Sequence, residues 1–157
     1  MMWNILAKEL DQESALLGKR NTAENLYRMW KKNQAVIHIL NSRIIGYAAL
    51  WDTPHPIWLE LGSMWVHELF RGNKIASELF LGCTRKLKKG MRMFVITHNL
   101  KVLHLAKKAG FLEAKEEKKW FSIPWKATCA PCDRLPISQQ RLCSMRAKRD
   151  KCALFFV

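Results

Sequence analysis

The sequence predicts an α/β (α+β) fold, in which helices and strands alternate along the chain. The N-terminal region carries apolar residues at helical spacing, and two apolar, β-branched segments with a short polar break follow it. The run LELGSMWVHELFRGNKIASELF, over residues 59–80, leads from an apolar strand through a polar turn into an amphipathic helix. With 157 residues, 49% of them apolar, the chain is long enough to bury a sizeable core.

The first elements are predicted to be two helices and a hairpin. Residues 2–17 repeat apolar side chains near helical spacing and predict the first helix. Residues 21–24, with the sequence NTAE, resemble a capping box and predict a second helix that runs through Lys32. Residues 35–40 and 44–51 are apolar and β-branched, and the three residues between them predict a hairpin.

The rest of the chain is predicted to continue with alternating strands and helices. Residues 52–56, DTPHP, predict a loop because proline lacks the amide hydrogen that a strand needs. A strand over residues 57–66 follows the loop. The later elements are a helix over 74–89 ended by Gly90, a strand over 91–97, a helix over 100–109 and a strand over 118–126.

Composition argues against a membrane or secreted protein. No apolar run reaches the roughly 20 residues that a transmembrane helix needs. The first residues, MMWNILAKELDQE, carry acidic side chains early and lack a cleavage-site pattern, so they do not predict a secretory signal. We therefore expect a cytoplasmic location.

The charge balance is strongly basic. The chain has 27 Lys and Arg against 13 Asp and Glu, a formal net charge of +14. One interpretation is a solvated basic surface with a few cations that hold ligand phosphates. The other is a polyanionic partner, such as tRNA, rRNA or an acidic protein. Basic charge alone does not choose between them.

The polar turn in residues 59–80 predicts a site for a phosphorylated ligand. The strand ends at Trp65–Val66, and five residues after Val66 the turn RGNKIA begins at Arg71 and opens a helix. The first amides of a helix lack intrahelical partners, and its N-terminus carries roughly half a positive charge. These two properties favour a bound phosphate group.

Two blocks of sequence resemble the GNAT superfamily of N-acetyltransferases. Residues 71–76 resemble its motif A, R/Q-x-x-G-x-G/A, which binds the pyrophosphate of acetyl-CoA. Arg71 fits the first position and Ala76 the last, whereas Lys74 stands where the family usually has glycine. Residues 99–111, NLKVLHLAKKAGF, resemble motif B, in which an asparagine precedes a helix that ends in Gly-Phe. The resemblance covers residues 22–115.

The resemblance implies a mixed, mostly antiparallel sheet with helices on both faces and a splayed central strand pair that admits CoA. It also implies direct acetyl transfer from acetyl-CoA to an amine, without an acyl-enzyme. Lys74 is expected either to loosen the turn, since it lacks the freedom of glycine, or to place its ammonium on a phosphate. The implied cofactor contacts are Trp65, Val66, Arg71, Gly72, Asn73, Lys74, Ile75, Ala76, Ser77 and Asn99.

Glu60 is the candidate general base. A lysine-like amine has a pKa near 10.4, so its deprotonation at pH 7 costs about 4.6 kcal/mol and needs a path for the proton. Glu60 lies six residues before Val66, in the strand that precedes the turn. Several GNAT members carry a glutamate there that resembles a base acting directly or through water. A strand glutamate that faces solvent or a basic neighbour is the alternative.

Two positions in the motif B block leave alternatives open. Asn99 resembles the family asparagine that bonds to the cofactor arm, but it also suits a simple helix cap. Seven residues later the family often has a tyrosine that protonates the leaving thiolate, whereas this chain has Ala106. The thiolate would then leave with help from water or another donor. Otherwise, the domain is a catalytically weak CoA-binding module.

The acceptor is not identified by the sequence. The net charge keeps open an RNA- or tRNA-directed acetyltransferase, or an RNA-binding protein. The same charge disfavours polycationic acceptors, because like charges repel. The resemblance also implies that a homodimer is an option, since GNAT proteins are often dimers.

The C-terminal segment is predicted to be a cysteine-rich, basic extension. Residues 1–125 are expected to form the acetyltransferase domain, and residues 126–157 an extension packed on it or appended to it. Four cysteines can make a tetrahedral zinc site, with the first two in a Cys-x-x-Cys pattern. Reduced cysteines packed as small apolar residues are the alternative. The candidate ligands are Cys129, Cys132, Cys143 and Cys152.

Overall fold

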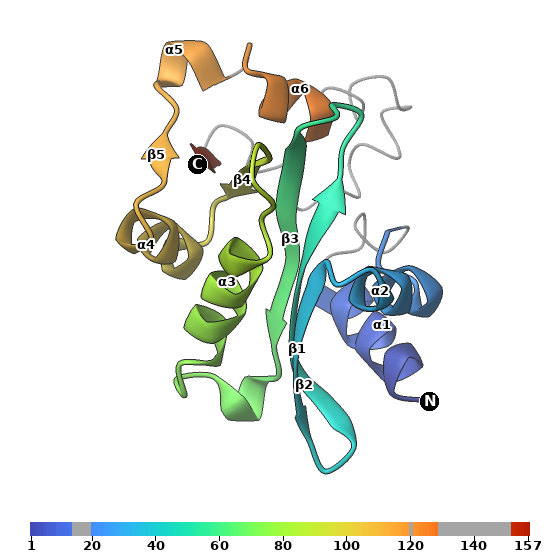
Figure 1. The fold of residues 1–157 in the computed structure, drawn as a ribbon. Helices are drawn as coiled ribbons and strands as arrows, with labels where there is room; N and C mark the ends of the chain where they lie inside the picture. Colours follow the sequence, from blue (N-terminus) through green and yellow to red (C-terminus); the bar gives the residue numbers. More distant parts are fainter. Residues whose placement is uncertain (14–19, 120, 129–151) are drawn as a thin grey trace, which may run out of the picture. The chain divides into compact units, whose positions relative to one another are not determined.

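A computed structural model describes residues 1–13, 20–119, 121–128 and 152–157 (Figure 1). The described strands follow the order β1-β2-β3-β4-β6-β5 in the sheet. The elements are α1 (Met2–Glu13), α2 (Ala23–Lys31), β1 (Ala35–Leu40), β2 (Arg43–Asp52), β3 (Trp58–Val66), the 3-10 helix η2 (Glu68–Phe70), α3 (Ile75–Arg85), β4 (Arg92–Thr97), α4 (Leu100–Lys108), β5 (Leu112–Glu113), α5 (Glu116–Lys119), α6 (Ile123–Thr128) and β6 (Ala153–Phe156).

The sheet is mixed and mostly antiparallel, which confirms the predicted fold class. β1 pairs with β2, β4 with β6, and β5 with β6 in antiparallel fashion. β3 and β4 are parallel, and their ladder joins Trp58–Glu60 to Arg92–Phe94. β3 continues beyond this ladder to Val66, and β4 continues to Thr97.

The chain divides into two compact units. The first contains Met1–Trp51 and Leu61–Leu87, and the second contains Asp52–Glu60 and Lys88–Val157. β3 therefore contributes its first three residues to the second unit and the remainder to the first.

The first unit is built on the β1–β2 hairpin. Asn41 and Ser42 have φ angles of 47° and 59°, and Leu40 pairs with Arg43 across the turn. A two-residue turn in which both residues have positive φ matches the right-handed twist of the strands it joins. The predicted hairpin is confirmed, with a loop one residue shorter because Arg43 belongs to the strand.

Helices cover both faces of this hairpin (Figure 1). On one face α1 and α2 pack against β2, where the Tyr47 hydroxyl donates a hydrogen bond to the Leu26 carbonyl and burial raises the pKa of Tyr47. On the other face, a Cβ added to Gly46 would lie 2.7 Å from Ile75, so α3 approaches β2 closely at a glycine. The first core contains Leu6, Leu10, Leu26, Met29, Ala35, Ile44, Tyr47, Ala49, Trp51 and Trp65.

The second unit has its own core. Its sheet brings β6 beside β4, with Phe94 opposite Phe156 and Thr97 opposite Ala153. α6 contributes Trp125 to the core on one face, while the Lys107 ammonium of α4 lies 5.8 Å from the Phe155 ring centroid. Because neighbouring strand residues point to opposite faces, α4 and α6 lie on opposite faces of these strands. The second core contains Trp58, Phe94, Ile96, Trp125, Cys152 and Leu154.

The strand predicted over residues 118–126 is wrong, since this segment contributes to the helices α5 and α6. The Lys119 ammonium donates to Glu116 Oε1 at 2.8 Å, three residues earlier in the chain, which is a helical spacing. Pro124 lies in the first turn of α6, where no helical bond requires its missing amide hydrogen.

Two predicted helices have different ends in the structure. The helix predicted over 74–89 ends at Arg85, because the Lys86 and Leu87 amides bond to the carbonyls three residues before them and tighten the last turn. The first helix is described through Glu13, and the predicted residues 14–17 lie outside the described residues.

Sequence reasoning missed β6, which pairs with both β4 and β5.

Of the four candidate zinc ligands, Cys129, Cys132 and Cys143 lie outside the described residues, and Cys152 is buried. The described residues contain no group of three side chains that could hold a metal ion, so zinc gains no support. The boundaries of the C-terminal extension stay a prediction.

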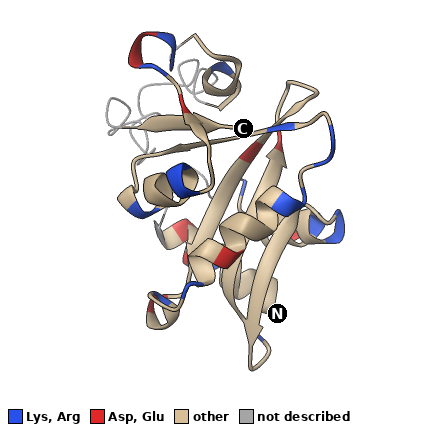
Figure 2. Cartoon of the chain, turned by 60° about the vertical axis from the view of Figure 1, so that its left-hand side comes forward, with Lys and Arg blue, Asp and Glu red and all other residues tan. Residues whose placement is uncertain are grey.

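Charged residues are spread over helices and turns, with Lys and Arg more frequent than Asp and Glu (Figure 2). Between Glu78 and Glu113 the chain carries eight Lys and Arg and no acidic residue. Within the described part of the chain, no helix is long and apolar enough to cross a membrane. A polyanionic partner stays a prediction.

Candidate functional site

β3 is irregular three residues before its end. Ser63 has a φ of 52°, a left-handed conformation that is uncommon for a non-glycine residue. Its hydroxyl is buried, accepts a hydrogen bond from Trp51 Nε1 at 3.0 Å and donates one to Asn21 Oδ1 at 2.6 Å. The two bonds hold the strand in this conformation. Beyond it, Trp65 and Val66 are consecutive buried residues, which departs from regular alternation.

The turn after β3 is fastened to the end of the strand. The Arg71 side chain donates from Nε to the Val66 carbonyl at 2.9 Å. The His67 amide donates to the Ile45 carbonyl on β2, and the Phe70 amide donates to the His67 carbonyl, both at 2.9 Å. Arg71, the first residue of the motif A pattern, therefore shapes the turn.

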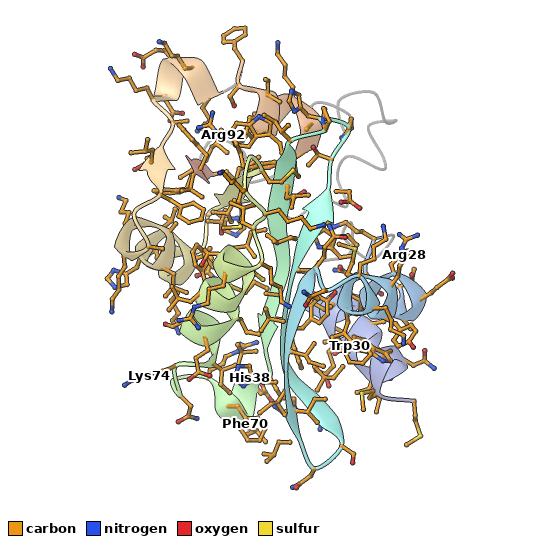
Figure 3. All side chains as sticks on the ribbon, viewed as in Figure 1. Arg28, Trp30, His38, Phe70, Lys74 and Arg92 are labelled. Atoms are coloured by element: carbon orange, nitrogen blue, oxygen red, sulfur yellow. The ribbon has the colours of Figure 1, made fainter. Side chains whose placement is uncertain are left out.

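Lys74 begins α3 in the left-handed conformation, with φ 62° and ψ −1°. This is the conformation to which glycine is best suited, and the family pattern has glycine at this position. The Lys74 side chain makes no capping hydrogen bond, is exposed and points outward from the turn (Figure 3). Lys74 thus adopts the backbone conformation that suits glycine, and it adds an ammonium group at the start of the helix.

The start of α3 has the properties of an anion site. Its first helical bond runs from the Glu78 amide to the Lys74 carbonyl at 3.1 Å, so the amides before Glu78 precede the helical ladder. Residues 71–74 are exposed, while Ile75 is buried against Gly46 and fixes the helix. Gly72 has a φ of 92° with open space around its Cβ position, so its role is conformational.

Glu60 belongs to the second unit. It pairs with Phe94 in the parallel ladder and is half-buried. Strand alternation places it on the same face as Trp58, the face on which Trp125 packs. Thr128 Oγ1 lies 3.5 Å from Glu60 Oε2, at the limit of a hydrogen bond. Glu60 is thus a carboxylate on a partly accessible face, a position compatible with proton transfer.

Asn99 and Ala106 also belong to the second unit. Asn99 is the N-cap of α4, because its Oδ1 accepts from the Lys101 amide at 3.0 Å. Its own amide donates to Thr97 Oγ1 at 3.0 Å. Ala106 is completely buried and carries no dissociable proton, so it cannot replace a proton-donating tyrosine.

Sequence reasoning did not bring His98 and Lys119 together with Cys152, which it named only as a candidate zinc ligand. His98 Nδ1 lies 4.0 Å from Cys152 Sγ, and the Lys119 ammonium donates to the Cys152 carbonyl at 2.8 Å. Lys119 is 2% exposed, which is unusual for a lysine. The signal for this cluster would have been β6 itself. It was missed because its four residues follow a long basic segment.

The structure therefore separates the predicted site residues into two groups. Residues 65–77 lie together in the first unit, as one strand end, turn and helix start. Glu60, Asn99 and Cys152 lie in the second unit. Their roles toward a ligand stay predictions.

Comparison with known proteins identifies the fold. The sequence matches a family profile described as the acetyltransferase (GNAT) family over residues 3–111. No curated protein matches the sequence. Rv2747 from Mycobacterium tuberculosis, in complex with CoA and NLQ, is similar with a TM-score of 0.56 and 12% identity, over 96% of this chain and 94% of that one.

Two further solved structures are similar to the chain. N-acetylglutamate synthase from Neisseria gonorrhoeae, complexed with coenzyme A and N-acetyl-glutamate, has a TM-score of 0.54 and 14% identity, over 95% of this chain and 32% of that one. An acetyltransferase of the GNAT family from Streptococcus pneumoniae has a TM-score of 0.50 and 16% identity, over 62% of this chain and 64% of that one. The chain therefore spans only part of these two relatives, and at such identities the similarity concerns the fold.

Proposed function

Because this chain belongs to the GNAT family of acetyltransferases, we propose that it transfers an acetyl group from acetyl-CoA to an amine. The start of α3 carries the proposal, since residues 72–77 offer backbone amides beside the exposed side chains of Arg71 and Lys74. Amides at a helix start donate hydrogen bonds to phosphate oxygens, and the helix dipole favours their negative charge. CoA in the Mycobacterium and Neisseria structures of this fold supports the same cofactor here.

We assign the other cofactor contacts from the hydrogen-bonding groups that each residue offers. Backbone groups of Trp65 and Val66, at the end of β3, suit the amide groups of the pantetheine arm. Asn99 Oδ1 is used in the cap of α4, and its Nδ2 has the donor chemistry for a cofactor carbonyl. Residues 72–77 would hold the pyrophosphate, with the Lys74 ammonium as an added point charge.

Glu60 is the proposed general base. In the transfer step the acceptor nitrogen attacks the thioester carbonyl carbon, the carbon–nitrogen bond forms, and the carbon–sulfur bond breaks. The amine proton passes to Glu60 directly or through water. The CoA thiolate leaves with the electron pair of the broken bond and takes a proton from water or another donor, because Ala106 has none to give.

Calorimetric titration of acetyl-CoA tests the cofactor part of the proposal. We expect micromolar binding to the full chain. Absence of binding at millimolar acetyl-CoA would overturn the cofactor part of the proposal.

Release of CoA thiol in the presence of a panel of amines tests acetyl transfer. Glu60→Gln keeps the shape of the side chain but removes the base, and we expect it to lower kcat about 100-fold, within the usual range for general-base catalysis. Unchanged turnover would exclude Glu60 as the base.

A catalytically weak CoA-binding module is the second candidate, favoured by the buried Ala106 where the family often has a tyrosine. This candidate predicts acetyl-CoA binding without thiol release for any amine. If the wild-type protein turns over and Glu60→Gln abolishes this turnover, the module is excluded. Both candidate functions thus predict the same acetyl-CoA titration, but they predict opposite results in the assay for CoA thiol release.

A further inference from the structure

A buried hydrogen-bonded chain in the first unit ends in a donor that has no acceptor. The indole nitrogen of Trp51 can only donate, so Ser63 Oγ accepts its hydrogen at 3.0 Å. The Ser63 hydrogen then goes to Asn21 Oδ1 at 2.6 Å. This order fixes the Asn21 amide with its carbonyl oxygen toward Ser63 and its Nδ2 on the opposite side.

Asn21 Nδ2 is the unsatisfied end of the chain. The Asn21 residue is 2% exposed, and its Nδ2 is buried with no hydrogen-bond partner among the residues that the structure describes. Folded proteins rarely leave a buried amide group unpaired, and such an exception calls for an explanation. Two N–H hydrogens are therefore available for an oxygen that the described residues do not provide.

The residue before Asn21 in the chain is a cation, Arg20. The guanidinium carbon of Arg20 is 4.7 Å from the centroid of the Trp51 ring, the same tryptophan that bonds to Ser63. The Arg20 carbonyl accepts from Asn25 Nδ2 at 3.1 Å, which holds the backbone here against the start of α2. Amide and guanidinium donors on consecutive residues suit a carboxylate, which accepts several hydrogen bonds and carries the opposite charge.

The position of this cluster relates it to the proposed cofactor site. Ser63 precedes Val66 by three residues on β3, which is about 10 Å along a strand. Both the cluster and residues 65–77 belong to the first unit. The pantetheine arm separates the CoA thioester from its pyrophosphate, so the acceptor must be held at a distance from the phosphate turn. A cluster that contacts β3 at Ser63 fulfils this requirement.

We propose that Asn21 and Arg20 bind the carboxylate of the acceptor, which makes the acceptor a small amine that also carries a carboxylate. The inference rests on the proposed acetyl transfer, and it names the substrate class. Asn21 Nδ2 is buried, so the proposal requires neighbouring side chains to move aside when the carboxylate binds. The formal net charge of +14 favours the approach of an anionic acceptor.

Matched acceptors test the proposal. Glycine, L-glutamate and L-lysine are each compared with their α-carboxamides, which keep the amine but lose the carboxylate charge. The measurement is CoA thiol release from acetyl-CoA. For at least one pair we expect kcat/KM to be tenfold or more higher for the acid. Equal rates for all pairs would overturn the proposal.

Variants of the cluster sharpen this test. Asn21→Asp keeps an acceptor for Ser63 but replaces the two N–H donors with negative charge, and Arg20→Met removes the cation. We expect both to raise KM for the acid tenfold or more while KM for the amide and the affinity for acetyl-CoA stay within twofold. Arg28→Met is the matched control, because Arg28 is an exposed α2 cation outside the cluster (Figure 3).

Binding measurements separate failure of this proposal from failure of acetyl transfer. The same acids and amides are titrated calorimetrically into the protein with and without CoA, and thermal melting confirms that each variant is folded. If an acid binds to the wild type and Asn21→Asp abolishes that binding, the site is supported even if no acetyl group is transferred. A folded Asn21→Asp protein that treats acids and amides as the wild type does would overturn it. Asn21 Nδ2 would then serve only an internal water.

Discussion

The helices α3 and α4 begin in opposite ways. α4 is capped by its own sequence, because Asn99 Oδ1 accepts from the Lys101 amide at 3.0 Å. α3 follows Lys74, which is left-handed and makes no side-chain cap. α2 resembles α4, since Thr22 Oγ1 accepts from the Asn25 amide at 3.2 Å. Two helix starts are thus stabilised from within, and the start of α3 is not.

This difference separates a structural helix end from the one at which we propose that the cofactor binds. A capped helix uses a side-chain oxygen to satisfy one of its first amides, and it gains roughly 1 kcal/mol in stability. An uncapped start leaves those amides for solvent or a ligand. In α3 the uncapped end also carries strain, because a lysine in the left-handed conformation is less stable than a glycine by about 1 kcal/mol. A stability cost at an exposed helix start is typical of a functional site.

The largest expected effect comes from reversing the charge at the uncapped end. Lys74→Glu places a carboxylate where the pyrophosphate is proposed to bind. We expect acetyl-CoA affinity to fall 10- to 100-fold, which corresponds to about 1.4–2.7 kcal/mol. Calorimetric titration at two salt concentrations measures it, and the difference from wild type should shrink at high salt because exposed charges are screened.

Lys101→Glu is the matched control for this charge reversal. Lys101 is exposed in the first turn of α4, so the substitution changes the net charge equally but at the capped helix. We expect less than a threefold change in acetyl-CoA affinity. Equal losses in both variants would mean that the protein attracts the cofactor through overall charge rather than through the start of α3.

Local signals in the sequence predicted most of the first unit. The hairpin followed from two β-branched segments, and the start of α2 from a cap at Thr22, because such turns depend on a few neighbouring residues. The turn over residues 71–76 was an equally local signal. The sequence could not show that Lys74 would adopt φ 62°, since residues other than glycine seldom adopt the left-handed conformation.

In the second unit β4 and α4 were predicted, and the predictions failed where contacts link distant residues. Residues 118–126 combine aromatic and basic side chains that resemble a strand, but the Lys119 ammonium bonds to Glu116 and to the Cys152 carbonyl. The second of these partners lies 33 residues later in the chain. In the first unit, the hydrogen bond between Ser63 and Asn21 joins residues 42 apart in the chain, so the candidate carboxylate site could not be predicted from neighbouring residues.

The next effect tests whether Asn99 has one role or two. Asn99→Ala removes the cap, and we expect a loss of about 1 kcal/mol in the free energy of unfolding, a decrease of roughly 2–4 °C in Tm. Asn99→Ser retains a capping oxygen and should restore most of that stability. If both variants weaken acetyl-CoA binding, Asn99 also contacts the cofactor. If neither does, its role is confined to the cap.

The smallest effect comes from restoring the family's glycine at the uncapped end. Lys74→Gly relieves left-handed strain of about 1–2 kcal/mol and adds about 0.5–1 kcal/mol of freedom to the unfolded chain, so we expect the free energy of unfolding to rise by about 0.5–1 kcal/mol. The backbone amides remain while the ammonium is lost, so acetyl-CoA affinity should fall severalfold at low salt and match wild type at high salt. Denaturant unfolding and titration measure the two quantities. A loss of stability would show that the Lys74 side chain stabilises the turn, and that the contrast between α3 and α4 does not arise from strain.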